Sequence, residues 1–183
     1  MKYELTVIKE LEHTLSGISE GDTEKLAKLI QGANSVFVAG CGRSGLMVRA
    51  FAMRLMHMGK RAFVVGETTT PSIQKGDLLL IASGSGETGS LVAMAKKCCN
   101  MGIALATVTI FPNATIGKMA DVTVVIDAPT AKSEETTATT SIQPMGSLFE
   151  QSLLLYLDSM ILRLMELEGA TSEIMFKLHA NLE

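Results

Sequence analysis

The chain has 183 residues, 47% of them hydrophobic and 19% charged, and a formal net charge of −3 at pH 7. These values predict one globular domain with a sizeable core and argue against a disordered protein. Aromatic residues make up 4% and there is no basic block, so nucleic acid is not an expected partner. No apolar run nears the roughly 18 residues that span a bilayer, so a membrane is not expected either.

The N-terminal part, residues 1–33, is predicted to form two helices. Apolar residues recur at helical spacing from Leu5 to Ile18. A break at residues 21–23 starts a second helix that continues to Ile30. We expect these helices to belong to a single domain that spans 1–183, since no linker or internal repeat divides the chain.

Strands and helices alternate through residues 34–128. The predicted strands are 35–39, 62–65, 77–82, 103–110 and 121–126, and the clearest helices between them are 44–58 and 90–101. Because the strands are continuous apolar runs, they predict a parallel sheet that is buried on both faces. The expected fold class is α/β, a three-layer αβα sandwich whose five-stranded doubly wound sheet has the flavodoxin-like order 2-1-3-4-5.

A polar, Thr-rich loop over residues 129–144 separates this core from the C-terminal helices of residues 145–183. Connections of this length are often functional. The long helix from about Gly146 to Glu168 is apolar over more of its circumference than one covering face requires. This excess predicts burial against a second subunit as well as against the sheet, and therefore a homo-oligomer.

The cysteines and the N-terminus indicate a cytoplasmic protein. Cys41, Cys98 and Cys99 form an odd set. Adjacent Cys98 and Cys99 lie in an apolar helix without metal-ligand spacing, and we interpret them as reduced core residues. The first residues, with Glu4 among them, lack the apolar region of a signal peptide. No clustered set of His, Cys and carboxylate side chains predicts a metal site.

The most informative segment follows the third predicted strand and reads Ser83-Gly84-Ser85-Gly86-Glu87-Thr88. Its glycines let successive backbone N–H groups converge, and the next helix adds unpaired N–H groups and the positive end of its dipole. Hydroxyls of Ser83, Ser85 and Thr88 can complete a cage for a phosphate monoester. The alternative is an ordinary strand-to-helix loop in which the Ser and Thr side chains act as caps.

A second loop, Gly40-Cys41-Gly42-Arg43-Ser44-Gly45, follows the first predicted strand and matches G-x-G-x-x-G. Glu67 follows the second strand at about the offset of a ribose-binding acid, so a dinucleotide site is one interpretation. The single five-strand unit and the separate phosphate loop argue against it, and Arg43 can offer its guanidinium to an anion. In the order 2-1-3-4-5 both loops face one crevice, which predicts a site for a phosphorylated small molecule.

Three further residues are candidates for proton transfer. Glu150 stands three residues after Ser147, the spacing of a capping box, and by spacing alone it has a structural role. His57 lies at a predicted helix C-terminus, which favours a partly charged ring and again a structural role. His179, in the C-terminal tail, has no evident local purpose, and both a structural and a functional role stay open.

At these residues the sequence resembles the 6-phospho-3-hexuloisomerases of the sugar isomerase (SIS) domain superfamily. The resemblance covers essentially the whole chain and rests on segments 42–45, 51–59, 65–67, 83–88, 142–151 and 179–183. The loop at 83–88 marks the superfamily, whereas Pro-Met-Gly-Ser-Leu-Phe-Glu before position 151 and the His-Ala-Asn-Leu-Glu ending are much narrower. Cys41 is a mild variant where a small residue such as alanine is usual.

The resemblance implies an isomerase that interconverts D-arabino-hex-3-ulose 6-phosphate and D-fructose 6-phosphate through a cis-enediolate. The reaction belongs to the ribulose monophosphate pathway of formaldehyde fixation. The resemblance also implies a homotetramer with active sites shared between subunits, and no metal or organic cofactor. Two alternatives are another SIS isomerase with a different ketose or aldose phosphate, and a non-catalytic regulator that binds a sugar phosphate.

Moving the carbonyl from C3 to C2 requires a base, an acid and positive charge for the enediolate. The resemblance outweighs the capping-box interpretation and gives the base to Glu150. His179 is the expected proton shuttle, from a neighbouring subunit, and whether His179 or His57 transfers the proton stays open. The predicted substrate-binding residues are Arg43, Ser44, Glu67, Ser83, Gly84, Ser85, Gly86, Glu87 and Thr88.

Overall fold

The computed structural model of the chain describes residues 2–130 and 140–182. Its strands are β1 (Val36–Gly40), β2 (Ala62–Val64), β3 (Leu78–Ala82), β4 (Ala104–Thr109) and β5 (Val122–Val125). All neighbouring strands pair in parallel, in the order β2-β1-β3-β4-β5. The predicted α/β class and the strand order 2-1-3-4-5 are confirmed.

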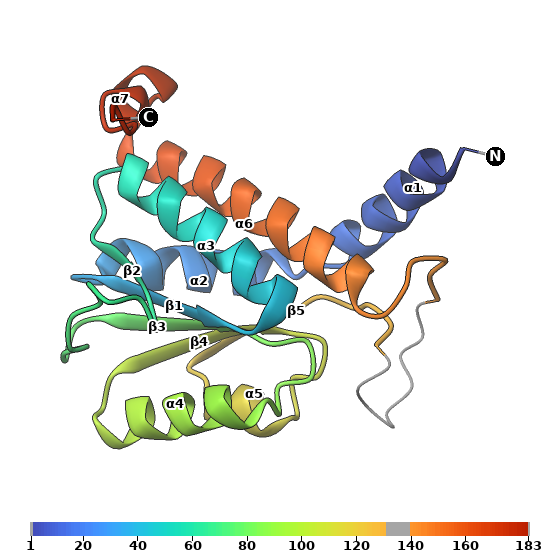
Figure 1. Cartoon of the computed structure of the whole chain (residues 1–183), viewed down its shortest axis with the longest axis horizontal. Helices are drawn as coiled ribbons and strands as arrows, with labels where there is room; N and C mark the ends of the chain where they lie inside the picture. Colours follow the sequence, from blue (N-terminus) through green and yellow to red (C-terminus); the bar gives the residue numbers. More distant parts are fainter. Residues whose placement is uncertain (1, 131–139, 183) are drawn as a thin grey trace.

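Helices cover both faces of this sheet (Figure 1). They are α1 (Tyr3–Ser16), α2 (Glu20–Gly32), α3 (Gly42–His57), α4 (Gly89–Asn100), α5 (Thr115–Met119), α6 (Ser147–Glu168) and α7 (Ser172–Phe176). Side chains of α2, α3 and α6 share one hydrophobic cluster, and those of α4 and α5 share another on the opposite face. The five-residue helix α5 is too short for an apolar periodicity, so the sequence does not predict it. In α4, Cys98 is buried as predicted, but Cys99 faces outward and is exposed, so the prediction of a core residue is wrong for Cys99.

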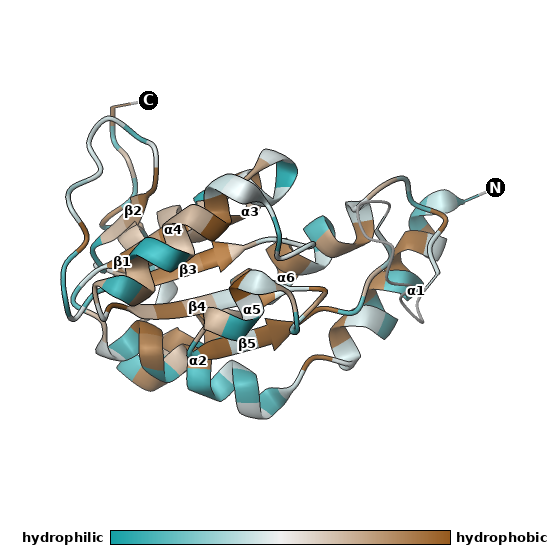
Figure 2. Ribbon diagram, turned by 90° about the horizontal axis from the view of Figure 1, so that it is seen from below, coloured by the Kyte–Doolittle hydropathy of each residue, from teal (hydrophilic) through white to brown (hydrophobic). Residues whose placement is uncertain are grey.

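The central strands are buried on both faces, as their continuous apolar runs predict. Leu78 and Leu80 of β3 pack into the cluster under α3 and α6, whereas Leu79 and Ile81 pack into the cluster under α4. Each such side chain, fully buried, contributes roughly 1.5–3 kcal/mol. Figure 2 shows the strands as largely hydrophobic, while the helices alternate between hydrophilic and hydrophobic residues.

The register of β1 and β3 brings the two predicted anion-binding loops together. Gly40 at the end of β1 pairs with Ala82 at the end of β3, so the loops that follow them leave the sheet side by side. Helix α3 then packs tightly against β1, since a Cβ atom on Gly45 would lie 2.7 Å from the carbonyl oxygen of Gly40. Only glycine at position 45 permits this close approach.

Helix α6 runs along α3, and its two ends lie far apart (Figure 1). Its N-terminus is near the carboxyl ends of the strands, and α7 follows beyond its C-terminus. Apolar side chains remain exposed on α1 and α6, among them Ile8 and Leu162. No helix within the described residues has the length and hydropathy to cross a membrane.

Candidate active site

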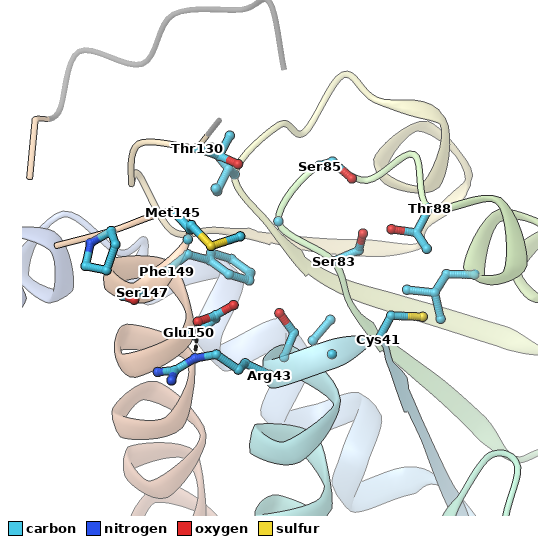
Figure 3. Close-up of a pocket in the computed structure, with 18 residues that line it drawn as sticks. Cys41, Arg43, Ser83, Ser85, Thr88, Thr130, Met145, Ser147, Phe149 and Glu150 are labelled. Atoms are coloured by element: carbon cyan, nitrogen blue, oxygen red, sulfur yellow. Dashed lines mark hydrogen bonds and ion pairs between the residues drawn. The ribbon is translucent and has the colours of Figure 1, made fainter. Parts of the chain in front are cut away.

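A pocket of about 390 Å³ lies at the carboxyl ends of β1 and β3. Its wall comes from the turn after β1, the loop after β3, residues 144–146 and the first turn of α6 (Figure 3). The volume falls within the range of small-molecule sites in proteins. Segments that are far apart in the sequence therefore form one site at the predicted crevice.

The loop at 83–88 is shaped by its own hydrogen bonds. The N–H of Gly86 donates to the hydroxyl of Ser83 at 3.2 Å, and the N–H of Glu87 donates to the hydroxyl of Ser85 at 3.3 Å. Gly86 has φ +64°, and a Cβ atom there would lie 2.7 Å from the Cβ of Ala114. A hydroxyl that accepts a hydrogen bond still has its own O–H to donate. Both serines line the pocket with a donor that an anion could use.

Two helices point their N-termini at the same pocket. Helix α3 begins after Cys41 and α4 begins after Thr88, and within the described residues neither Cys41 nor Thr88 makes a side-chain capping hydrogen bond. The capping interpretation of this threonine is therefore wrong. Unpaired N–H groups and the positive ends of two helix dipoles remain for a ligand, which is the arrangement that favours phosphate. Ser44 and Gly84 also line this part of the pocket.

The carboxylate of Glu150 lies at the other side of the pocket, in the first turn of α6 (Figure 3). The N-cap of α6 is Gly146 rather than Ser147, and no side-chain capping bond to this helix start exists among the described residues. The capping-box interpretation is therefore wrong. The Glu150 side chain is 17% exposed, so it is a mostly buried carboxylate at a pocket wall.

Arg43 reaches this carboxylate rather than the phosphate loop. Its Nε atom lies 2.5 Å from Oε2 of Glu150, and its side chain is 57% exposed. In Figure 3 the guanidinium lies beside α6, away from Ser83, Ser85 and Thr88. Its charge is thus next to the carboxylate of Glu150 at the pocket wall.

Three predicted binding residues do not line the pocket. Glu67 pairs with Arg49 of α3 at 2.5 Å. Glu87 accepts a hydrogen bond from the N–H of Thr115 at 2.6 Å, and this bond lowers the pKa of the Glu87 carboxyl. Gly86 provides the turn that lets the loop approach α5. In the chain by itself, these residues shape the elements around the site.

His179 lies at the far end of α6, against His57. The two rings stack with centroids 5.2 Å apart, and both line a second pocket. Burial, followed by the charges of Arg54 and His179, lowers the pKa of the buried His57. Helix α6 has 22 residues and is therefore roughly 33 Å long. His179 of one chain cannot serve the pocket of the same chain, so a shuttle role requires a neighbouring subunit.

Sequence reasoning missed the wall beside Glu150. Met145 lines the pocket and has φ +57°. The preceding residues are held by Glu10 of α1, whose carboxylate accepts hydrogen bonds from Ser141 Oγ (2.7 Å), Ile142 N (2.9 Å) and Gln143 Nε2 (3.0 Å). Burial by itself would raise the pKa of Glu10, but these hydrogen bonds outweigh it and lower the pKa. No local sequence pattern reveals a contact between residues so far apart.

The arrangement has the parts for anion binding at one side and proton transfer at the other. Hydrogen-bond donors suited to an anion lie on the loop after β3 and at two helix N-termini, and a carboxylate with an adjacent guanidinium lies across the pocket from them. No group of three or more His, Cys, Asp or Glu side chains in the described ranges 2–130 and 140–182 could hold a metal ion.

Comparison with known proteins gives consistent matches. The SIS domain model matches residues 29–155. The 3-hexulose-6-phosphate isomerase of Bacillus subtilis is 47% identical over 183 residues, covering 100% of this chain and 98% of that protein. The enzyme of the same name from Methylomonas aminofaciens is 37% identical, covering 100% and 99%. A solved structure from Methanococcus jannaschii, inferred to be a 3-hexulose-6-phosphate isomerase, is 32% identical with a TM-score of 0.84 and full coverage of both chains.

Proposed function

The chain belongs to the SIS domain family, and from this premise we propose that it is a 3-hexulose-6-phosphate isomerase. It interconverts D-arabino-hex-3-ulose 6-phosphate and D-fructose 6-phosphate. The observation that carries the proposal is that two uncapped helix N-termini and the carboxylate of Glu150 meet in one pocket of about 390 Å³. That pocket has room for an open-chain hexulose phosphate with one end anchored.

The phosphate end of the substrate binds at the loop after β3. Ser83, Ser85 and Thr88 donate their hydroxyls, and backbone N–H groups at the starts of α3 and α4 donate with them, together with Ser44. Hydrogen bonds to a charged group contribute about 1.5–3 kcal/mol each, so a few of them suffice to hold the substrate. The anchored phosphate directs the carbon chain toward Glu150.

The proton is transferred at the opposite wall. Glu150 takes the proton from C2 and negative charge develops on the C3 oxygen, which gives the cis-enediolate, or the cis-enediol when that oxygen also gains a proton. Return of the proton to C3, with loss of the proton from the C2 hydroxyl, leaves the carbonyl at C2, and no external oxidant or reductant is needed. Arg43 holds the Glu150 carboxylate and stabilises the developing negative charge.

The proposal extends to assembly and cellular role. We place the enzyme in the cytoplasm as a single-domain homotetramer in which His179 of one subunit serves as acid in the site of a neighbour. Exposed apolar side chains on α1, α6 and α7 support an assembly of subunits. The reaction would follow the synthase that condenses formaldehyde with ribulose 5-phosphate in the ribulose monophosphate pathway.

A coupled assay tests the function. Formaldehyde, ribulose 5-phosphate and the synthase generate the hexulose phosphate, and formation of fructose 6-phosphate on addition of this protein is the expected result. Glu150→Gln is the matched control and should leave at most residual turnover. Faster isomerisation of another ketose or aldose phosphate would identify a different isomerase. Tight binding of sugar phosphates without turnover would identify a regulator.

A further inference from the structure

Met145 has an unusual backbone at the wall of the pocket. Its φ of +57° makes it the one non-glycine residue with a positive φ among residues 2–130 and 140–182. Glycine adopts this conformation with a smaller free-energy cost than any residue with a Cβ atom. A glycine does stand one position later, at 146, and yet the left-handed position carries a methionine.

The side chain of Met145 is also exposed, with 75% of its surface accessible. In Figure 3 it extends over Phe149 into the pocket, on the side opposite Ser83 and Thr88. An apolar side chain left in water adds nothing to the stability of the ligand-free chain. A strained backbone and an exposed apolar side chain therefore coincide at one residue of the site, which is the pattern of a functional position.

Contacts on both sides fix this backbone. Glu10 accepts hydrogen bonds from residues 141–143, as described above, and Gln151 Nε2 of α6 donates to Gln143 Oε1 at 2.7 Å. We call this set of contacts the Glu10 anchor. On the other side, the N–H of Ser147 donates to the carbonyl oxygen of Pro144 at 3.2 Å, and the N–H of Glu150 donates to that of Gly146 at 3.0 Å. The peptide that carries Met145 is thus held between helix α1 and the first turn of α6.

We propose that Met145 covers the reacting carbons of the bound sugar phosphate, and that the Glu10 anchor holds its backbone in the covering position. The inference rests on the proposed isomerase function. Between its removal from C2 and its return to C3, the proton is on Glu150, where water can exchange it. A flexible thioether side chain over this carboxylate excludes water and adapts to both sugar isomers.

Turnover in deuterated water tests the cover. Product formed by wild-type protein is analysed by NMR for deuterium at C3 of fructose 6-phosphate in the first turnover. Met145→Ala should incorporate more deuterium and lose about tenfold in kcat/KM. Met145→Leu, which keeps the apolar volume, should restore both values toward wild type. Equal labelling in wild type and Met145→Ala would overturn the proposal.

Met145→Gly separates a cover from a structural role. Glycine relieves the backbone, so Tm should rise by roughly 2–4 °C, while labelling should rise as in Met145→Ala. A residue that served only the fold would not improve stability and impair the reaction together. If Met145→Ala instead changes the mass measured by light scattering and leaves labelling unchanged, the side chain belongs to a subunit interface and the proposal is wrong.

The Glu10 anchor has its own test. Glu10→Ala should raise labelling in the same direction as Met145→Ala, and the double variant should add little, because both changes act on one wall. Glu12→Ala, at an exposed position of the same helix, is the matched control and should have no effect. Calorimetric binding of fructose 6-phosphate to the Met145 variants needs no turnover. It therefore still reports on the cover if the wild-type protein fails to isomerise.

Discussion

The Nε atom of Arg43 lies 2.5 Å from Oε2 of Glu150, a contact that joins the first turn of α3 to the first turn of α6. It fixes the carboxylate at the pocket wall and leaves its other oxygen, Oε1, toward the backbone of Gly146. Within residues 2–130 and 140–182, Oε2 is thus held by a cation and Oε1 makes no hydrogen bond, so Oε1 can accept a proton from a ligand. This division suits a base that must be oriented and still accept a proton.

Glu150→Gln tests the base. The amide cannot accept the C2 proton, so the isomerase rate should fall by about 10² to 10⁴. Substrate binding should change little, because the groups proposed to bind the phosphate lie on the other side of the pocket. Steady-state rates and exchange of the C2 or C3 hydrogen with deuterated water measure the two effects. Glu166→Gln on the same helix is the control, and normal turnover in Glu150→Gln would move the base to His179.

Arg43→Lys tests whether the guanidinium positions the carboxylate. An ammonium group cannot reproduce a contact made through Nε, so kcat should fall by about tenfold while KM stays nearly constant. The expected loss in kcat is modest because the Arg43 side chain is 57% exposed, and solvent weakens its ion pair with Glu150. A large rise in KM with unchanged kcat would instead make Arg43 a substrate ligand.

Ser85→Ala combined with Thr88→Ala tests the phosphate site. Two hydrogen bonds to a charged group are lost, so the affinity for fructose 6-phosphate should drop on the order of a hundredfold. Isothermal calorimetry measures the affinity. Glu87→Gln in the same loop is the control: its carboxylate bonds to α5, so that variant should lose stability rather than affinity. Unchanged affinity in the double variant would refute the site.

The acid side of the stability profile should report on Glu10. The pKa of Glu10 in the folded chain is lowered from 4.5. The ionised carboxylate therefore stabilises the fold at pH values above the pKa that it has in the unfolded chain. The contribution is lost as the pH falls below about 4.5 and through the folded pKa. The difference in Tm between wild type and Glu10→Gln should therefore be present at pH 7 and disappear in acid. A difference that is independent of pH would show that hydrogen-bond geometry, not charge, matters.

Mixing of inactive variants tests the shared site. Glu150→Gln and His179→Ala should each be inactive, and hetero-oligomers made by co-expression should recover part of the activity. Recovery is expected because one chain cannot bring both residues to one pocket, whereas the proposed assembly brings His179 of one chain to the pocket of its neighbour. If the co-expressed variants stay inactive while light scattering confirms mixed oligomers, His179 acts only through its stack on His57.

Much of the fold could be predicted because its signals are local. The continuous apolar runs at 35–39 and 77–82 correspond to β1 and β3 within one or two residues. The two glycine-containing loops were placed at the same crevice by strand order alone, and they meet there. These predictions need only periodicity and the geometry of parallel sheets.

The rest of the site depends on contacts between distant residues. Glu150 has a capping-box spacing, but its carboxylate bonds to Arg43, 107 residues away. Glu87 lies in the predicted phosphate-binding loop, and its carboxylate accepts a hydrogen bond from Thr115 instead. The anchor of residues 141–143 on Glu10 spans more than 130 residues. Sequence patterns assign a carboxylate to a partner within a few residues. In the folded chain each of these three carboxylates instead bonds to a residue that is distant in the sequence.

The length of α6 sets a fixed spacing in this enzyme. Glu150 is in its first turn and α7 follows its last, with 22 residues between the two helix ends. Insertion or deletion of a single residue within α6 would turn α7 by about 100° around the helix axis relative to Glu150. It would also move the apolar contacts with α3 out of register. Length variation among related chains should therefore accumulate in residues 130–144 and at the termini, and α6 should keep its residue count.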